Sequence, residues 1–231
     1  MKRFKILAMS VCLLVAAAGF AACGETEPPD PPGVTTYVYE AEDIYVSELS
    51  GPVFSGEASG YKMILGENIT YIKNNSNLMK SISGGYFLSY FNGVGTTLQF
   101  IFEADAASEG NTLLLRLASE WGTLKINPAN IEIRVNGEAV TYSELTVSGE
   151  KLSDDGSHSA YKTPFKDFEI SKDVKITAGE NIVELEVLTR EYGISTIEKY
   201  GPGVDCIKIK TTSALTWEKL FEENKDQIEQ K

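Results

Sequence analysis

The most constraining feature of this sequence is a two-residue alternation of apolar and polar side chains that recurs from Thr35 to Thr212. Successive side chains of a β-strand point to opposite faces, so this period is typical of strands with one buried and one solvated face. The clearest apolar rows are Leu98, Phe100 and Phe102; Leu113, Leu115 and Leu117; Ile131, Ile133 and Val135; Val183, Leu185 and Val187; and Ile207 and Ile209. Each row needs a second sheet to cover it. The sequence therefore predicts an all-β fold, one β-sandwich of two antiparallel sheets over residues 35–212.

Turn signals separate these rows. Asn136-Gly137 predicts a tight hairpin turn, and Ala178-Gly179-Glu180-Asn181 predicts a turn before another strand. Gly93-Val94-Gly95 lacks the third glycine and the helix of a dinucleotide site, so we expect a turn there. The polar segment 148–164 is expected to form a long loop.

The N-terminus has the pattern of an export signal. Lys2, Arg3 and Lys5 precede the apolar run 6–20, which is shorter than the ~20 residues of a membrane-spanning helix. The run ends in Phe-Ala-Ala and Cys23, which resembles a bacterial lipobox, and this implies a signal peptide over 1–22 and lipidation of Cys23. The alternative is an ordinary secretory signal in which Cys23 is incidental. Residues 23–34, rich in proline and acidic side chains, are expected to be an extended tether.

The charge balance narrows the choice of partner. Removal of residues 1–22 takes three of the 21 basic side chains and none of the 33 acidic ones, which leaves a net charge of −15. A surface this acidic repels phosphate backbones and anionic lipid headgroups. We therefore expect no nucleic-acid partner and no membrane contact except through the lipid anchor, whereas neutral sugars or cations are compatible.

Cysteine and histidine are too few for an intrachain disulfide or for a metal site built from these two residue types. Cys12 leaves with the predicted signal and Cys23 is the predicted lipidation site, so Cys206 has no disulfide partner and is expected to be a small buried thiol. His158 is the one histidine and lies in a polar segment. No serine-nucleophile elbow occurs. We therefore name no catalytic residue.

Three carboxylates are expected to lie close together, where a shared cation would neutralise their charges. Glu40 and Glu42 stand two residues apart in the first predicted strand, where alternation puts both on one side, about 7 Å apart. Asp205 begins the last strand on the same side as Ile207 and Ile209. The first and last strands of many sandwiches are adjacent, and like charges there need neutralisation, for which a hard cation such as calcium is suited. The alternative is a set of surface carboxylates that hold no metal.

Several motifs, taken in order, resemble the carbohydrate-binding modules of families 6 and 35. They are Tyr39-Glu40-Ala41-Glu42-Asp43, Gly84-Gly85-Tyr86-Phe87-Leu88, the strand 113–118 with Arg116, Val135-Asn136-Gly137, Thr177-Ala178-Gly179-Glu180-Asn181, and Gly201-Pro202-Gly203-Val204-Asp205. The resemblance spans most of the chain that follows the predicted signal. It implies a jelly-roll sandwich with a structural calcium held by Glu40, Glu42 and Asp205.

The same resemblance implies a sugar site in the loops at one edge of the sandwich. Trp121, directly after the Arg116 strand, stands at the matching loop, where an aromatic ring stacks on a sugar; the alternative is an indole packed within the protein. Gly203 replaces an asparagine that is common in the family, so one side chain that would bind a sugar hydroxyl is missing. Tyr200, Tyr192, Asn92 and Glu120 are candidates to compensate, and ordinary loop structure is the alternative for each.

The period changes near the C-terminus, where Trp217, Leu220, Phe221, Asn224 and Ile228 fall at helical spacing. We therefore expect a short helix within 213–231, packed on the sandwich or docked on an envelope protein.

Taken together, these features predict non-catalytic binding of a polysaccharide or oligosaccharide at the bacterial cell envelope, surface-exposed or facing the periplasm. The alternative is a structural or adhesion domain that recognises protein, and hydrolase activity is a third, weaker hypothesis.

Overall fold

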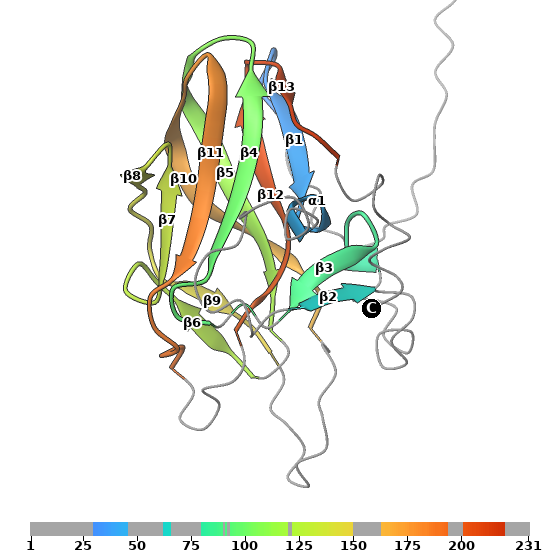
Figure 1. The fold of residues 1–231 in the computed structure, drawn as a ribbon, viewed down its shortest axis with the longest axis vertical. Coiled ribbons are helices and arrows are strands. Elements are labelled where there is room, and N and C mark those ends of the chain that lie inside the picture. The colour runs from blue at the N-terminus through green and yellow to red at the C-terminus, as the bar shows by residue number, and fades with distance from the viewer. Residues whose placement is uncertain are drawn as a thin grey trace, which may run out of the picture.

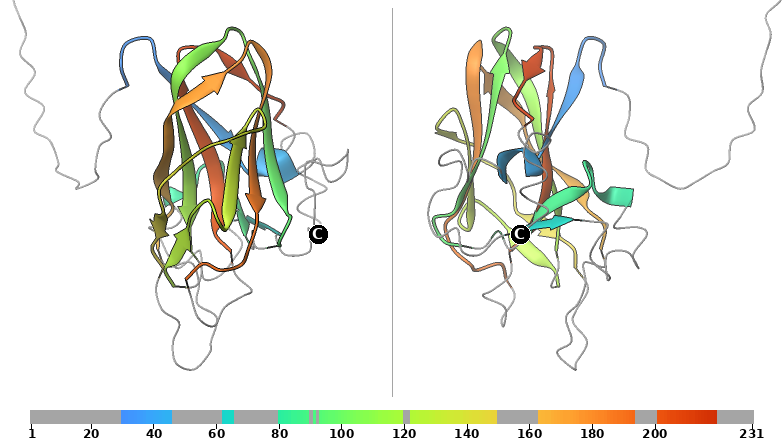
Figure 2. Two further views of the ribbon diagram at one scale, coloured as in Figure 1. Left: turned by 90° about the vertical axis from the view of Figure 1, so that its left-hand side faces the viewer. Right: turned by 45° about the vertical axis from the view of Figure 1, so that its right-hand side comes forward.

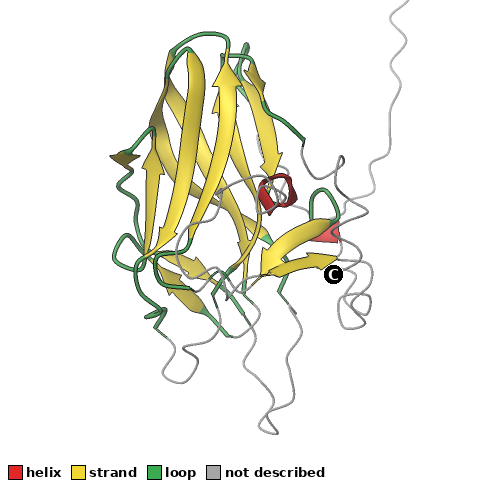
Figure 3. Cartoon of the chain, viewed as in Figure 1, coloured by secondary structure: helices red, strands yellow, loops and turns green. Residues whose placement is uncertain are grey.

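A computed structural model describes residues 30–45, 62–65, 80–89, 91, 93–119, 122–149, 163–193 and 201–219. Most of these residues lie in antiparallel strands (Figure 3). The strands form two large sheets that lie in layers, with β4, β7 and β11 in one and β5, β10 and β12 in the other (Figure 1). The predicted all-β sandwich of antiparallel sheets is confirmed.

The first sheet contains both the first and the last long strand of the sandwich. Its order is β10, β5, β12, β3 and β2, and β1 pairs with β12 beside this path. Its strands are β1 Thr35–Glu40, β2 Lys62–Leu65, β3 Tyr86–Ser89, β5 Ser108–Ala118, β10 Lys166–Ile176 and β12 Gly203–Thr211. β12 is thus central, with β5 along one edge and with β1 and β3 in succession along the other.

The second sheet has the order β13, β4, β11, β7 and β8. Its strands are β4 Thr97–Ala104, β7 Ile131–Val135, β8 Glu138–Ala139, β11 Gly179–Val187 and β13 Leu215–Thr216. A separate pair joins β6 Leu124–Ile126 to β9 Leu145–Val147. The chain passes from one large sheet to the other between β4 and β5, between β10 and β11 and between β11 and β12, as expected for a jelly roll (Figure 2).

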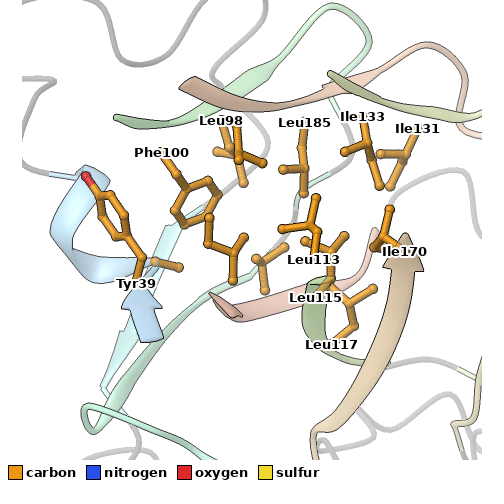
Figure 4. Packing of buried hydrophobic residues seen from close by; sticks show 14 of the residues in the cluster. Tyr39, Leu98, Phe100, Leu113, Leu115, Leu117, Ile131, Ile133, Ile170 and Leu185 are labelled. Atoms are coloured by element: carbon orange, nitrogen blue, oxygen red, sulfur yellow. The ribbon is translucent and has the colours of Figure 1, made fainter. Parts of the chain in front are cut away.

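The core lies between the two large sheets, as the alternation predicted. Leu98 and Phe100 of β4 face Leu113 and Leu115 of β5, and each is at most 1% exposed (Figure 4). Tyr39 extends this core at one side, with its ring 5.2 Å from that of Phe100 in an edge-to-face arrangement. At ~25 cal/mol per Å² of buried apolar surface, these rows supply the main driving force for closing the sandwich.

The predicted turns are also observed. Asn136 and Gly137 connect β7 to β8 with φ values of 52° and 81°, the two positive values that a two-residue hairpin turn requires. Gly179, with φ 91°, opens β11 after Ala178. Thr96 donates its backbone N–H to the carbonyl of Gly93, which closes the turn expected there.

The C-terminal expectation needs a correction. The described part of 213–231 holds the strand β13, which pairs with Ala104 and Glu103 of β4, and residues 213–219 contain no helix. Trp217 follows β13 and stacks on Tyr39 with 4.9 Å between ring centroids. Pairing with an open strand edge and partial burial of the indole against the core override the helical spacing here. The rest of the predicted helix, residues 220–231, lies outside the described residues.

The predicted tether also ends earlier than expected. Asp30 accepts a hydrogen bond from the Thr36 hydroxyl at 2.5 Å and lies 3.0 Å from the ammonium group of Lys210. Residues 30–34 therefore adjoin β1 and β12. The predicted signal peptide, Cys23 and the tether up to residue 29 lie outside the described residues, and so do residues 150–162 of the predicted long loop. Within the described ranges, no helix combines the length and the apolar character that a membrane crossing requires.

Candidate functional site: a buried carboxyl cluster

Antiparallel pairing of the first and last long strands brings two of the three predicted carboxylates together. Glu40 ends β1 and lies opposite Cys206 of β12, and the carbonyl of Asp205 accepts a hydrogen bond from the Ala41 N–H at 2.9 Å. The acidic oxygens of Glu40 and Asp205 and the sulfur of Cys206 all lie within 4.8 Å of one another. The predicted meeting of Glu40 and Asp205 at this strand junction is confirmed.

Asp205 reaches the cluster because of an irregularity in β12. The pairing of β12 with β5 shifts register between Val204 and Cys206, so Asp205 is an extra residue in a β-bulge. Its carboxylate lies 3.1 Å from the guanidinium Nε of Arg116, a residue that alternates with the core residues Leu115 and Leu117. Simple alternation put Asp205 on the side of Ile207 and Ile209, and that expectation is wrong because of the bulge.

Glu42 lies beside this group, outside the 4.8 Å set of ligand atoms, and it belongs to a helix and not to a strand. β1 ends at Glu40, and Glu42 is the first residue of the short helix α1, Glu42–Tyr45. Its side chain is 3% exposed, and its Oε2 is buried without a hydrogen-bond partner. A Cβ atom added to Gly84 would lie 2.0 Å from Oε1 of Glu42 and 3.3 Å from Cδ of Glu40. Both glutamates therefore pack against the backbone of Gly84.

Ser83, immediately before Gly84, connects the carboxylates. Its hydroxyl lies 2.8 Å from Oδ2 of Asp205 and 2.7 Å from Oε2 of Glu40, and its backbone N–H donates to Asp205 at 3.1 and 3.2 Å. A hydroxyl has a single proton to donate, so Ser83 cannot fully satisfy both carboxyl groups at once. Ser83 was not predicted as a site residue; the Ser-Gly-Gly turn before β3 is the signal in the sequence that marks it.

Burial makes the ionised cluster costly. It raises the pKa of Glu42 to about 9, and the neighbouring Glu40 and Asp205 add to this rise. Burial likewise raises the pKa of Asp205 to about 7, against the opposing effect of the hydrogen bonds from Ser83. The pKa of Glu40 is raised too, again chiefly by burial. A divalent cation would stabilise all three carboxylates, so these residues fit the hard ion that the sequence predicted.

A network of ion pairs borders the cluster on the outer face of the same sheet. Arg116 of β5 contacts Asp205 and also pairs with Asp167 of β10 at 2.7 Å. Asp167 in turn lies 2.5 Å from the ammonium group of Lys208 in β12. These contacts join three neighbouring strands beside the carboxyl cluster. They also hold Arg116 where its charge offsets part of the negative charge of Asp205.

The predicted sugar loop can be placed only by its ends. Trp121 and Glu120 lie outside the described residues, and so do Asn92 and Tyr200. On either side of the gap, the Ser119 hydroxyl donates to the carbonyl of Gly122 at 2.6 Å. The loop follows Ala118, which pairs with Gly203 at the start of β12. The loop therefore leaves the sheet beside the segment that leads to Asp205.

Tyr192 is the one predicted sugar contact within the described residues. It is 3% exposed and belongs to the hydrophobic core. Its backbone carbonyl accepts a hydrogen bond from the N–H of Lys125 at 2.9 Å, which fixes the segment against β6. A ring buried in this way cannot stack on a sugar, so the structure corrects this expectation. The apolar body of the tyrosine favours burial over exposure in a loop.

Comparison with solved structures finds similarity to family 35 carbohydrate-binding modules. A module from Clostridium thermocellum is 21% identical, with 76% of this chain and 98% of that chain covered and a TM-score of 0.44. A module from Cellvibrio japonicus is also 21% identical, with coverage of 71% and 94% and a TM-score of 0.39. A β-(1,4)-mannanase with such a module, from Podospora anserina, is 14% identical, with coverage of 78% and 28% and a TM-score of 0.44. No protein-family model and no curated protein matches the chain.

Proposed function

We propose that this protein binds glycan without cleaving it, as a lipid-anchored β-sandwich of the bacterial cell envelope with a structural calcium ion. The observation that carries the proposal is the meeting of the half-buried Glu40 with the buried Asp205 at the junction of β1 and β12, with the buried Glu42 beside them against Gly84. These are the positions that the resemblance to families 6 and 35 assigned to calcium. The order of the other motifs along the chain supports the same class of protein.

In this proposal, the cation is a structural element. It would neutralise three carboxylates, two from the adjacent elements β1 and α1 near the start of the sandwich and one from β12 near its end. The sugar would bind at the loop after β5, whose ends at Ser119 and Gly122 are joined by a hydrogen bond. Trp121 lies between these ends and would supply the stacking ring. The exported location and the anchor at Cys23 rest on the N-terminal pattern of the sequence.

A calcium titration tests the cation. Calcium added to chelator-treated protein is expected to raise the melting temperature, because an ion that binds only the folded state stabilises it by ~2.7 kcal/mol at 100 times its Kd. Glu40→Gln is expected to weaken this response, whereas Glu138→Gln, on the exposed strand β8, is the matched control and should respond like the wild type. A melting temperature that does not change with calcium would count against the site.

Glycan binding is tested separately, on arrays of plant, microbial and host glycans that include a disaccharide with glucuronic acid, a ligand present in one similar structure. Binding that Trp121→Ala abolishes while the calcium response persists is the expected result. Uniform absence of binding would favour the alternative of a structural or adhesion domain that recognises protein. Turnover of chromogenic glycosides would contradict the non-catalytic assignment.

A further inference from the structure

The carboxyl cluster contains a side chain that the calcium hypothesis does not use. Cys206 is fully buried, and it lies opposite Glu40 in the pairing of β1 with β12. Its neighbours Val204 and Ile207 belong to the hydrophobic core between the sheets, whereas Cys206 does not. Its sulfur lies 3.9 Å from Oδ2 of Asp205. The thiol therefore faces acidic oxygens and not the apolar core.

The spacing of these groups suits a small thiophilic ion. Zinc binds sulfur at ~2.3 Å and carboxylate oxygen at ~2.0–2.2 Å, so adjacent ligand atoms of a tetrahedral site are about 3.5 Å apart. The sulfur and Asp205 are already within a few tenths of an ångström of that separation, and all three ligand atoms lie within 4.8 Å of one another. Calcium takes oxygen ligands almost exclusively, whereas sulfur favours zinc and similar soft ions.

A second observation points to a ligand here independently of the cysteine. Glu42 is 3% exposed, its Oε2 has no hydrogen-bond partner, and its carboxyl group packs against Gly84 together with that of Glu40. A buried acidic oxygen without a partner is costly unless a proton or a cation accompanies it. Glu42 therefore borders the group of Glu40, Asp205 and Cys206, close enough that both Glu40 and Asp205 act on its charge.

We propose that Cys206 is a metal ligand in this cluster, and that it lets the site take a thiophilic divalent ion, zinc or cadmium, in competition with calcium. This inference rests on the proposed function, in which the same carboxylates bind a divalent cation. On binding, the S–H bond of Cys206 breaks, a sulfur–metal bond forms and the proton passes to solvent. One thiolate and the two carboxylates of Glu40 and Asp205 then leave a net charge of −1 around the ion, beside the guanidinium of Arg116.

Cadmium provides the direct test, because a cadmium–thiolate bond has an ultraviolet charge-transfer absorption that calcium and carboxylates lack. The full-length chain and its Cys206→Ser variant are titrated with cadmium in detergent. Cys12 and Cys23 are present in both proteins, so the difference spectrum isolates Cys206. We expect the wild type to show more cadmium–thiolate absorption than Cys206→Ser, and we expect this difference to saturate at one equivalent of cadmium. Identical cadmium spectra for the two proteins would overturn the proposal.

Affinities measured with zinc and with calcium complete the test. Cys206→Ser is expected to weaken zinc binding by at least about tenfold, since even a residue that only orients a ligand contributes ~10–100-fold. Calcium affinity is expected to change much less than zinc affinity, because serine replaces the sulfur with an oxygen that calcium accepts, and cooperative thermal unfolding in chelator shows that the variant folds. Unchanged zinc affinity would contradict the proposal.

Glu40→Gln separates this inference from the function on which it rests. If it leaves calcium binding intact, the cation site of the proposed function is itself wrong. If it weakens calcium binding while Cys206→Ser alters neither zinc nor cadmium, only the role of Cys206 is wrong.

Discussion

At the scale of single residues, Gly84 determines how closely two glutamates approach the backbone. Its φ of +60° is a conformation that residues with a Cβ rarely adopt, and a Cβ there would collide with Oε1 of Glu42. Gly85 shares the positive φ, at +96°, but a Cβ there would meet nothing within 4 Å. Substitution of either glycine would strain the backbone, but only substitution of Gly84 would also create a steric clash.

We predict that Gly84→Ala weakens calcium binding, because the added methyl group displaces the Glu42 carboxyl group from the cluster. Both Gly84→Ala and Gly85→Ala are expected to cost about 1–2 kcal/mol of folding stability from positive φ alone. Calcium affinity by isothermal titration calorimetry is the measurement, with Gly85→Ala as the control. Equal affinities for the two variants would show that the approach of Glu42 to Gly84 is unimportant for the ion.

The raised pKa of Glu42 leads to a prediction about how stability depends on pH. Folding raises its pKa from 4.5 to about 9, so the folded protein retains a proton that the unfolded chain releases. This contribution to stability is complete below pH 4.5 and is lost as the pH rises toward 9. In chelator at pH 8, Glu42→Gln is therefore expected to be more stable than the wild type by about 1 kcal/mol or more, at ~1.4 kcal/mol per pKa unit.

The measurement is thermal unfolding, in which 1 kcal/mol corresponds to ~2–4 °C for a chain of this size. With saturating calcium the wild type should be more stable than Glu42→Gln, because glutamine is a weaker ligand than a carboxylate. A variant that melts below the wild type in both conditions would indicate that Glu42 is needed for packing and not for the ion.

At the scale of elements, Asp167 links three strands of one sheet. It projects from β10, accepts hydrogen bonds from Arg116 of β5 and Lys208 of β12, and its side chain is 23% exposed. These two cationic donors outweigh burial and lower the pKa of Asp167. Its contribution to stability is thus present above its ordinary pKa of 3.8 and is lost as the pH falls below that value.

We expect Asp167→Asn to destabilise the sandwich by about 1 kcal/mol at pH 7, after allowance for partial solvent screening. The loss should shrink as the pH falls below 4. Asp173→Asn, at an exposed position of the same strand, is the control and should have little effect. Urea denaturation at pH 7 and pH 3 measures both variants, and a pH-independent loss would contradict the role of charge.

The same elements show what could be predicted from the sequence and what could not. Alternation placed the core rows of β4, β5, β7 and β11 because each follows the strand period without interruption. It failed for Asp205, because a bulge inserts one residue into β12, and for Glu42, because β1 gives way to α1. Ser83 was missed because its hydrogen bonds depend on how β3 approaches β12, and local sequence does not contain that information.

At the scale of the whole molecule, the sandwich is completed by residues after the last long strand. β13 pairs with β4, and Trp217 stacks on Tyr39 and lies in a T-shaped arrangement with Tyr37 at a centroid distance of 6.4 Å. The indole thus bridges the second sheet and β1 of the first. The sequence placed the boundary of the sandwich at residue 212, and the structure extends it through Trp217.

We predict that a chain ending at Ser213 is less stable than one ending at Lys219 by about 2–4 kcal/mol, from the loss of a partly buried aromatic side chain, of buried Leu215 and of the β13 pairing. Both chains lack residues 220–231, so the difference reports only on 214–219. Trp217→Ala in the full chain should account for most of this loss in thermal unfolding. Equal melting temperatures for the two truncated chains would contradict this role.

With the proposed lipid anchor at Cys23, the pairing of β1 with β12 would determine which end of the sandwich faces the membrane. Thr35 lies opposite Thr211 at one end of this pair, and Glu40 lies opposite Cys206 toward the other. A chain held at Cys23 would enter through the Thr35 end, which would then be nearer to the bilayer. The opposite pole, with the loop between Ser119 and Gly122, would point to the medium, where extended polymers are encountered first.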